Sequence, residues 1–190
     1  MESPIGRLWV VVSPHGLVSI SRGDLTGSDP DRQPVLDPDA TAPAVAELNE
    51  YFAGRLRTFS MRLDLRGAGA FDAAVWSAAR RIPYGETASY GELAALAGYP
   101  GAARATGGAM ARCQLSPVVP CHRVIHADGS IRGWGRDLWV KRWLLDLESP
   151  AGRRASSPWS DGDDQIEART GRAHDASVIN GQSRRRNSST

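Results

Sequence analysis

The sequence has few cysteines, almost no lysine and no long apolar run. Two cysteines among 190 residues, Cys113 and Cys121, are too few for the disulfide framework of a small secreted protein. The histidines show no zinc-ligand spacing, because His122 and His126 have no second pair of ligands. The first apolar run, Leu8–Val12, is too short for a signal peptide or a membrane helix. We therefore expect a reduced, cytoplasmic, soluble protein with neither a metal site nor a membrane partner.

The charge of the chain is nearly balanced, with 23 basic and 21 acidic residues and a net charge of +2. This balance excludes a uniformly basic coat for nucleic acid but leaves room for a local basic face. Residues 1–66 carry −2, from seven arginines and nine acids, whereas residues 67–150 carry +2, from nine basic and seven acidic residues. Lys141 is the only lysine, and it stands out against a background of arginine.

Residues 1–66 have the pattern of a small α/β unit with no visible chemistry. Apolar β-branched runs predict strands, Asp, Pro and Gly predict a loop, and apolar residues at helical spacing predict a helix. The expected elements are two strands around a Pro-His-Gly turn, a loop, a helix and a third strand: Leu8–Val12, Leu17–Ile20, 23–41, Ala44–Phe52 and Met61–Leu65.

Residues 67–150 are more helical. An apolar face predicts a helix over Phe71–Ile82, and a capping box at Ser89–Glu92 predicts a short helix that ends at Gly98. After a Tyr-Pro-Gly turn, Ala102–Arg112 forms the next expected helix. Two short helices around a tight turn suggest a helix-turn-helix, although many packed helical hairpins share this pattern. The second helix is rich in Ala and Gly, so it can closely approach another helix or a nucleic-acid groove.

The tail over residues 151–190 is rich in Ser, Arg, Gly and Asp and has no apolar periodicity. It cannot bury enough apolar surface to offset the ordering of the chain, so we interpret it as disordered.

A group of residues that suggests chemistry surrounds Cys121, which lies between Pro120 and His122 in the run Pro120–Val124. A buried structural cysteine is one interpretation, since free cysteines are commonly interior. The flanking His and Arg favour another, because cationic or basic neighbours promote the thiolate that acts as a nucleophile. We expect an extended segment here, in which adjacent side chains point to opposite faces. A water would then bridge Cys121 and His122.

The run Pro120–Val124 resembles the active-site motif of the O6-alkylguanine-DNA alkyltransferases, the methylated-DNA–protein-cysteine methyltransferases. Further motifs of this family recur in the same order, and the resemblance covers residues 3–148. They are Ser3–Gly6, Ile82–Thr87, Ser89–Ala94, Ala102–Gly107, and Lys141 with Leu144, Leu145 and Glu148.

The resemblance implies direct transfer of an alkyl group from O6 of guanine to the sulfur of Cys121. Glu148 would orient His122, and His122 would take the thiol proton through a water. Tyr90 would donate a proton to the leaving base, and Lys141 would polarise the site near Tyr90 and O6. Because the thioether product is stable, each molecule would react once, and no cofactor is needed.

The implied substrate is double-stranded DNA that carries O6-alkylguanine, and the damaged base must be flipped out of the stack. The helix-turn-helix would lie in the minor groove, with Arg104 replacing the extruded base and Tyr90 rotating its 3′ phosphate. The resemblance places further residues at the DNA or in the substrate pocket: Ala103 at the DNA, and Met110, Val124, Trp134 and Gly135 around the base.

Two positions depart from the family pattern. The family usually has Asn-Pro where this chain has Cys113 and Gln114, and glycines where it has Arg136 and Asp137. The second change would either narrow the pocket to small alkyl groups or leave Arg136 and Asp137 paired outside it. Close to Cys121 in sequence, Cys113 is also a candidate for disulfide formation under oxidation.

The resemblance implies a monomer with an RNase H-like α/β domain of mainly structural role (1–66), a helical, winged helix-turn-helix catalytic domain (67–150) and the disordered tail. Two other functions are weighed against repair. One is a non-catalytic sensor of alkylated DNA that recruits other repair factors, which the presence of Cys121 disfavours. The other is a cysteine hydrolase, which would turn over acyl substrates without a stable sulfur adduct.

Overall fold

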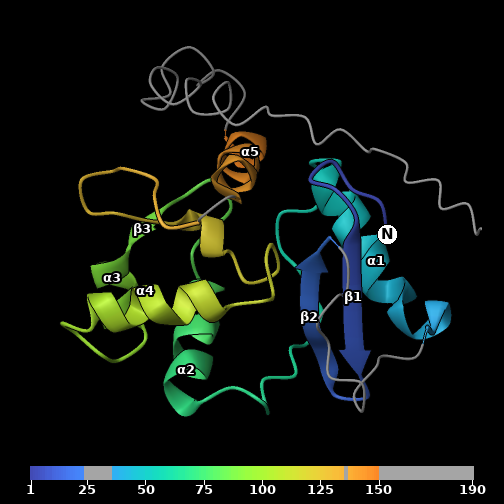
Figure 1. Cartoon of the computed structure of the whole chain (residues 1–190), viewed down its shortest axis with the longest axis horizontal. Coiled ribbons are helices and arrows are strands. Elements are labelled where there is room, and N and C mark those ends of the chain that lie inside the picture. The colour runs from blue at the N-terminus through green and yellow to red at the C-terminus, as the bar shows by residue number, and fades with distance from the viewer. Residues whose placement is uncertain (24–35, 135–136, 150–190) are drawn as a thin grey trace, which may run out of the picture. The chain divides into compact units, whose positions relative to one another are not determined.

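The computed structural model describes residues 1–23, 36–134 and 137–149 (Figure 1). The expectation of disorder over 151–190 and most of the expected loop over 23–41 lie outside these residues. In chain order the elements are β1 (Leu8–Ser13), β2 (Gly16–Arg22), α1 (Pro38–Phe52), α2 (Ala70–Ala79), β3 (Ala88–Ser89), α3 (Tyr90–Leu96), α4 (Ala103–Arg112), η2 (Cys121–Arg123), β4 (Val124–Ile125) and α5 (Leu138–Glu148).

The first two strands form an antiparallel hairpin, as the sequence predicts, with Leu8 opposite Arg22. The expected third strand over Met61–Leu65 is wrong, because only Leu63 makes a bridge, to Leu17 of β2. The carboxylate of Asp64 accepts hydrogen bonds from the Ser13 hydroxyl and from the amide and side chain of Arg66. These side-chain bonds turn the chain after a single bridge and compete with a longer ladder.

Helix α1 begins at Pro38 and not at Ala44, so the expected loop is too long at its carboxyl end. Asp37 caps the helix by accepting a hydrogen bond from the amide of Ala40, and proline is favoured in the first turn that follows. The helix lies beside β1 and buries one face, which includes Leu48 and Tyr51 (Figure 1).

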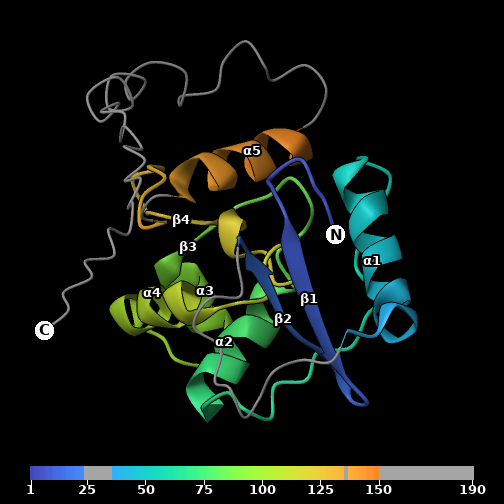
Figure 2. The same ribbon diagram turned by 45° about the vertical axis from the view of Figure 1, so that its right-hand side comes forward.

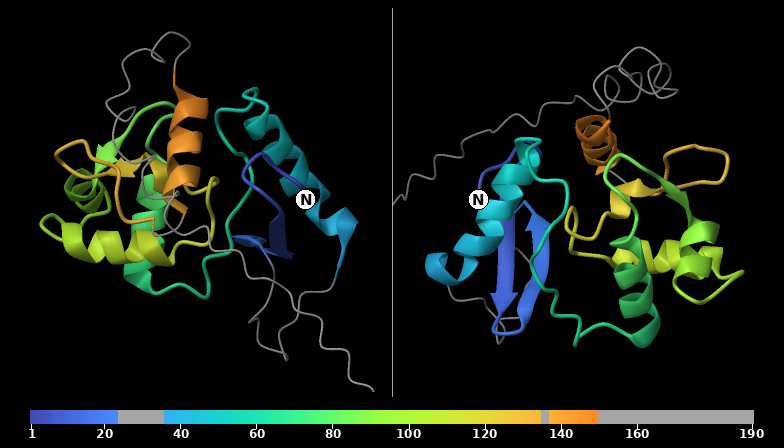
Figure 3. Two further views of the ribbon diagram at one scale, coloured as in Figure 1. Left: turned by 45° about the horizontal axis from the view of Figure 1, so that its top comes forward. Right: turned by 180° about the vertical axis from the view of Figure 1, so that it is seen from behind.

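Helices α2, α3 and α4 pack against one another (Figure 3). The expected capping box is confirmed, because the Ser89 hydroxyl accepts from the amide of Glu92 and the Glu92 carboxylate accepts from the amide of Ser89. Helix α2 ends at Ala79, earlier than the expected Ile82. Trp76 of α2 donates from its indole to the carbonyl of Ala109 in α4, at 2.9 Å, which ties the two helices together.

The segment after Pro120 forms η2 and then pairs in parallel with β3, so that Val124 lies opposite Ala88. Helix α5 packs on η2 (Figure 2), and its buried face includes Lys141, Leu144 and Glu148. Within the described residues, none of the helices has the length and apolar character that crossing a membrane requires.

Candidate functional site around Cys121

Cys121 lies in a tight 3₁₀ turn, so the expectation of an extended segment at this position is wrong. The amide of Arg123 donates to the carbonyl of Pro120 at 3.0 Å, and extended structure begins only at Val124. With three residues per turn, successive side chains point about 120° apart. Cys121, His122 and Arg123 therefore leave the backbone in three directions, and all three are buried.

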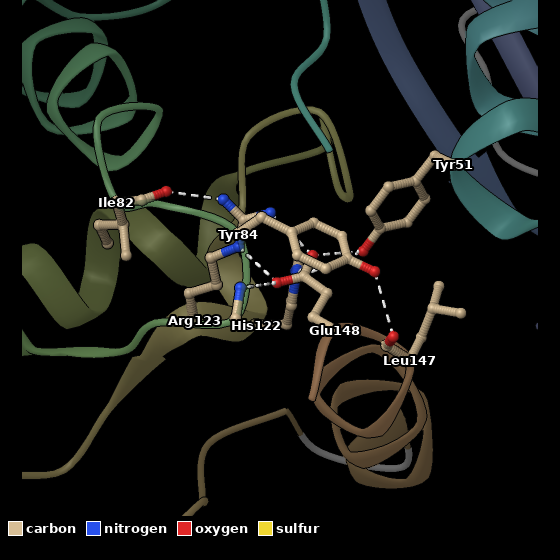
Figure 4. Close-up of polar contacts among 8 residues, drawn as sticks. Tyr51, Ile82, Tyr84, His122, Arg123, Leu147 and Glu148 are labelled. Atoms are coloured by element: carbon tan, nitrogen blue, oxygen red, sulfur yellow. Dashed lines mark hydrogen bonds and ion pairs between the residues drawn. The ribbon is translucent and has the colours of Figure 1, made fainter. Parts of the chain in front are cut away.

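Glu148, at the end of α5, gathers the donors on one side of this turn (Figure 4). Its Oε1 is 2.9 Å from Nε2 of His122 and accepts from Nη2 of Arg123 at 2.8 Å. Its Oε2 accepts from Nε of Arg123 at 2.7 Å and from the amide of Gly85 at 3.3 Å. The buried Glu148 carboxylate, paired with the Arg123 guanidinium, thus joins η2 to α5.

The same contact assigns the proton on His122. An ionised carboxylate only accepts hydrogen bonds, so Nε2 of His122 carries the proton that faces Glu148. Its Nδ1 atom is buried and has no hydrogen-bond partner among the described residues. A neutral imidazole in this tautomer presents a lone pair at Nδ1, which can accept a proton directly or through a water.

The ionisation states agree with this assignment. Burial lowers the pKa of His122, although the hydrogen bond to Glu148 acts in the opposite direction. Burial alone would raise the pKa of Glu148, but the hydrogen bonds from His122 and Arg123 hold it well below its usual range. At neutral pH the site therefore contains a carboxylate and a neutral imidazole.

The thiol of Cys121 is not activated by itself. The hydrogen-bonded thiol of Cys113 and the burial of the sulfur raise the pKa of Cys121, while the charge on Lys141 lowers it. Lys141 is buried, donates from Nζ to the carbonyl of Val124 at 2.7 Å, and has its pKa lowered by burial to about 8. A base must therefore remove the thiol proton if Cys121 is to react at neutral pH.

Cys121 is one of the residues that line a cavity of about 320 Å³. Of the expected pocket residues, Met110 and Trp134 line it, whereas Gly135 lies outside the described residues. Tyr90, the expected proton donor, also lines it. Lys141 and Val124 contact each other behind the turn and do not belong to the lining. Burial raises the pKa of Tyr90, as does the nearby charge of Cys121, so its hydroxyl keeps its proton.

Cys113 and Gln114, which depart from the family pattern, also line this cavity, and so does Asp137. Asp137 forms an ion pair with Arg22 of β2. Arg136 lies outside the described residues, so its expected pairing with Asp137 stays a prediction.

Of the three expected DNA-contact residues, Ala103 and Arg104 lie on α4 and are not among the residues that line the cavity, whereas Tyr90 begins α3 and lines it. Arg104 is exposed and makes no ion pair with the described part of the chain, whereas Arg112 on the same helix is paired with Asp72. Ala103 lies in the first turn of α4 and is partly buried. Gly107 lies against Tyr90, since a Cβ built on it would be 3.9 Å from the Tyr90 ring.

Sequence reasoning missed two members of the buried network, Tyr51 and Arg123. Tyr51 belongs to α1, in the segment expected to carry no chemistry, yet its hydroxyl donates to Oε1 of Glu148 at 2.7 Å. Its spacing of three residues from Leu48 marks it only as a core residue of the helix. Arg123 belongs to the motif Pro120–Val124, but no signal in the sequence pairs it with Glu148.

Known proteins resemble the chain over almost the whole of this structure. Residues 1–65 match the family model described as "6-O-methylguanine DNA methyltransferase, ribonuclease-like domain", and residues 70–150 match its "DNA binding domain". The methylated-DNA–protein-cysteine methyltransferase of Mycobacterium bovis is 47% identical over 148 residues, which cover 78% of this chain and 89% of the relative. The namesake from Methanosarcina acetivorans is 40% identical and covers 77% and 94%.

Two solved structures also resemble this chain. The O6-methylguanine methyltransferase of Mycobacterium tuberculosis superposes with a TM-score of 0.70 at 44% identity and covers 80% of this chain and 93% of that one. OGT of the same organism, in complex with DNA, superposes with a TM-score of 0.68 at 43% identity and the same coverage. The expected mixed α/β architecture with two domains is confirmed at this level, and the chain belongs to the 6-O-methylguanine DNA methyltransferase family.

Proposed function

We propose that this chain is a DNA repair protein that transfers a methyl or other small alkyl group from O6 of guanine in duplex DNA to its own Cys121. The observation that carries the proposal is the state of His122. Glu148 holds its Nε2 atom, while its Nδ1 atom is buried, has no hydrogen-bond partner in the described part of the chain, and belongs to the residue next to a buried thiol. This is the arrangement of a base that is ready to accept a proton from sulfur.

The reaction forms one bond and breaks one. The Cys121 sulfur attacks the alkyl carbon in line, the S–C bond forms, and the C–O6 bond breaks. The thiol proton passes through a water to Nδ1 of His122, and the leaving guanine takes a proton from the Tyr90 hydroxyl. Proton return from His122 through solvent restores Tyr90. The thioether is a poor leaving group, so each molecule reacts once.

In this mechanism Lys141, which is hydrogen-bonded to Val124, supplies a positive charge near Cys121. The charge on Lys141 lowers the pKa of Cys121 and so favours the thiolate as it develops. The carbonyl of Val124 accepts a hydrogen bond from Lys141 and lies outside the cavity lining. Cys121 belongs to the lining, and we propose that its carbonyl accepts from the exocyclic amine of guanine.

Helices α3 and α4 are proposed to act as the helix-turn-helix, with α4 in the minor groove. Arg104, which is exposed and has no ion pair among the residues that the structure describes, would fill the gap left by the flipped base, next to Ala103 at the start of the helix. The base would enter the cavity lined by Met110 and Trp134 and stop beside Cys121. Contacts of this kind are directed mainly at the DNA backbone and carry little sequence preference.

The test is the intact mass of the protein after incubation with duplex DNA that contains O6-methylguanine. We expect a gain of one methylene, located on the Cys121 peptide, and no gain for the Cys121→Ser variant. Binding to the duplex without a mass gain would indicate the sensor. Turnover of acyl substrates without an adduct would indicate the hydrolase, and either result would reject the proposal.

A further inference from the structure

Tyr51 reaches the proposed reaction centre from the part of the chain that matches the ribonuclease-like domain. It lies near the end of α1 and is fully buried. Its hydroxyl donates to Oε1 of Glu148 at 2.7 Å and lies 3.5 Å from Nε2 of His122 (Figure 4). The catalytic half of the protein is therefore completed by a group from the other half.

The Tyr51 ring is held in place on several sides. Its centroid lies 5.5 Å from that of Phe52, 5.1 Å from that of Phe59 and 6.4 Å from that of Tyr84. A phenol enclosed by other rings has few alternative rotamers, so its hydroxyl can fix the position of the group that it contacts.

The contact falls on a crowded oxygen. Oε1 of Glu148 receives donors from Tyr51, His122 and Arg123, although a carboxylate oxygen has only two lone pairs. The hydroxyl of Tyr51 therefore shares Oε1 with the imidazole and limits how much negative charge the imidazole receives. Without it, the carboxylate would be more basic toward His122 and would hold the imidazolium more tightly.

We propose that Tyr51 is a positioning residue for alkyl transfer, which fixes the Glu148 carboxylate so that His122 keeps its proton on Nε2 and presents Nδ1 as the base. This inference rests on the proposed function, because it assigns a role in that same reaction. It also gives the first domain a part in the chemistry in addition to its structural role.

The groups that set the ionisation of His122 come from several elements. Glu148 of α5 favours the charged imidazole, whereas Arg123 of η2 and Lys141 of α5 disfavour it, as does burial. Tyr51 of α1 acts on this balance through Glu148. Loss of its hydroxyl should raise the pKa of His122 and leave fewer molecules with a neutral base at mildly acidic pH.

The experiment is the pH profile of single-turnover alkyl transfer in the full-length Tyr51→Phe variant. The matched control is Tyr84→Phe, because Tyr84 belongs to the same ring cluster but donates its hydroxyl to the carbonyl of Leu147. We expect the acidic limb of Tyr51→Phe to move to higher pH. A shift of half a pH unit lowers the rate on that limb about threefold, while the rate at alkaline pH and the affinity for DNA are retained.

The outcomes separate the two proposals. If the wild type forms no adduct, the proposed function fails. If the wild type reacts and Tyr51→Phe shows the wild-type profile, or an equal loss at every pH, Tyr51 has only a structural role. Nitrogen NMR of the wild-type imidazoles provides a second measurement that does not depend on the variant: a proton on Nδ1 of His122 would overturn the inference.

Discussion

Cys113 and Cys121 line the same cavity, and the Cys113 thiol raises the pKa of the Cys121 thiol. Cys121 is buried and Cys113 is partly exposed, and both are free thiols. An oxidant would therefore reach Cys113 first. The Cys121 thiol could then displace water from the oxidised sulfur of Cys113. Cys113, which stands where we expected the family to have asparagine, thus gives the proposed nucleophile a neighbouring thiol with which it can react.

We predict that hydrogen peroxide converts the pair to an intramolecular disulfide. Each thiol loses one hydrogen, peroxide is reduced to two waters, and the protein loses its alkyl-transfer activity. Dithiothreitol should restore the activity in the wild type. In Cys113→Ala, peroxide should instead drive Cys121 to sulfinic acid, which dithiothreitol does not reverse. Two thiols that remain open to alkylating reagents after mild oxidation would contradict this prediction.

Glu148→Gln should strongly destabilise the fold. The change leaves the buried guanidinium of Arg123 without its counter-charge, and breaking a buried ion pair costs about 3–5 kcal/mol. Asp146→Asn is the control, since Asp146 is exposed on the same helix and its replacement should change stability by less than about 0.5 kcal/mol. Urea unfolding of the three proteins measures the difference, and equal midpoints would show that the pair adds nothing.

The free energy of unfolding should fall as the pH drops below about 6.5, the ordinary pKa of histidine. Because burial lowers the pKa of His122 in the folded protein, the unfolded chain takes up its proton first, and acid shifts the equilibrium toward unfolding. His122→Gln should remove this dependence between pH 5 and 7, since no such proton remains to be bound. Urea unfolding across that range measures it, and parallel curves for both proteins would refute the assignment.

Arg104→Ala should slow the repair of duplex DNA without slowing the reaction with a free O6-alkylguanine nucleoside. The lost contact to the stack should cost about tenfold in rate at limiting DNA, which corresponds to about 1.4 kcal/mol. Arg112→Ala is the matched control, because Arg112 lies on the same helix and its charge is already paired with Asp72. An equal loss in both variants would indicate a general effect of charge and no insertion at the flipped base.

The sequence predicted those parts of the fold in which local chemistry decides. The capping box at Ser89 and Glu92 and the hairpin around Gly16 depend on neighbours a few residues apart, and both are confirmed. The predictions failed where a distant or side-chain contact overrides a local pattern. The alternation in Met61–Leu65 suggests a strand, but the bonds of Asp64 to Ser13 and Arg66 end it after one bridge.

By itself the sequence determined the family and the methyltransferase activity and predicted Cys121 as the reactive thiol, because the motif around Cys121 and its ordered companions are linear features. Only the tertiary structure decided which groups surround the residues of that motif. The Glu148 carboxylate selects the tautomer of His122, Arg123 holds the carboxylate ionised, and Tyr51 joins them from another domain. Hydrogen bonds and charges act over a few ångströms of space, and spacing along the chain does not reveal those distances.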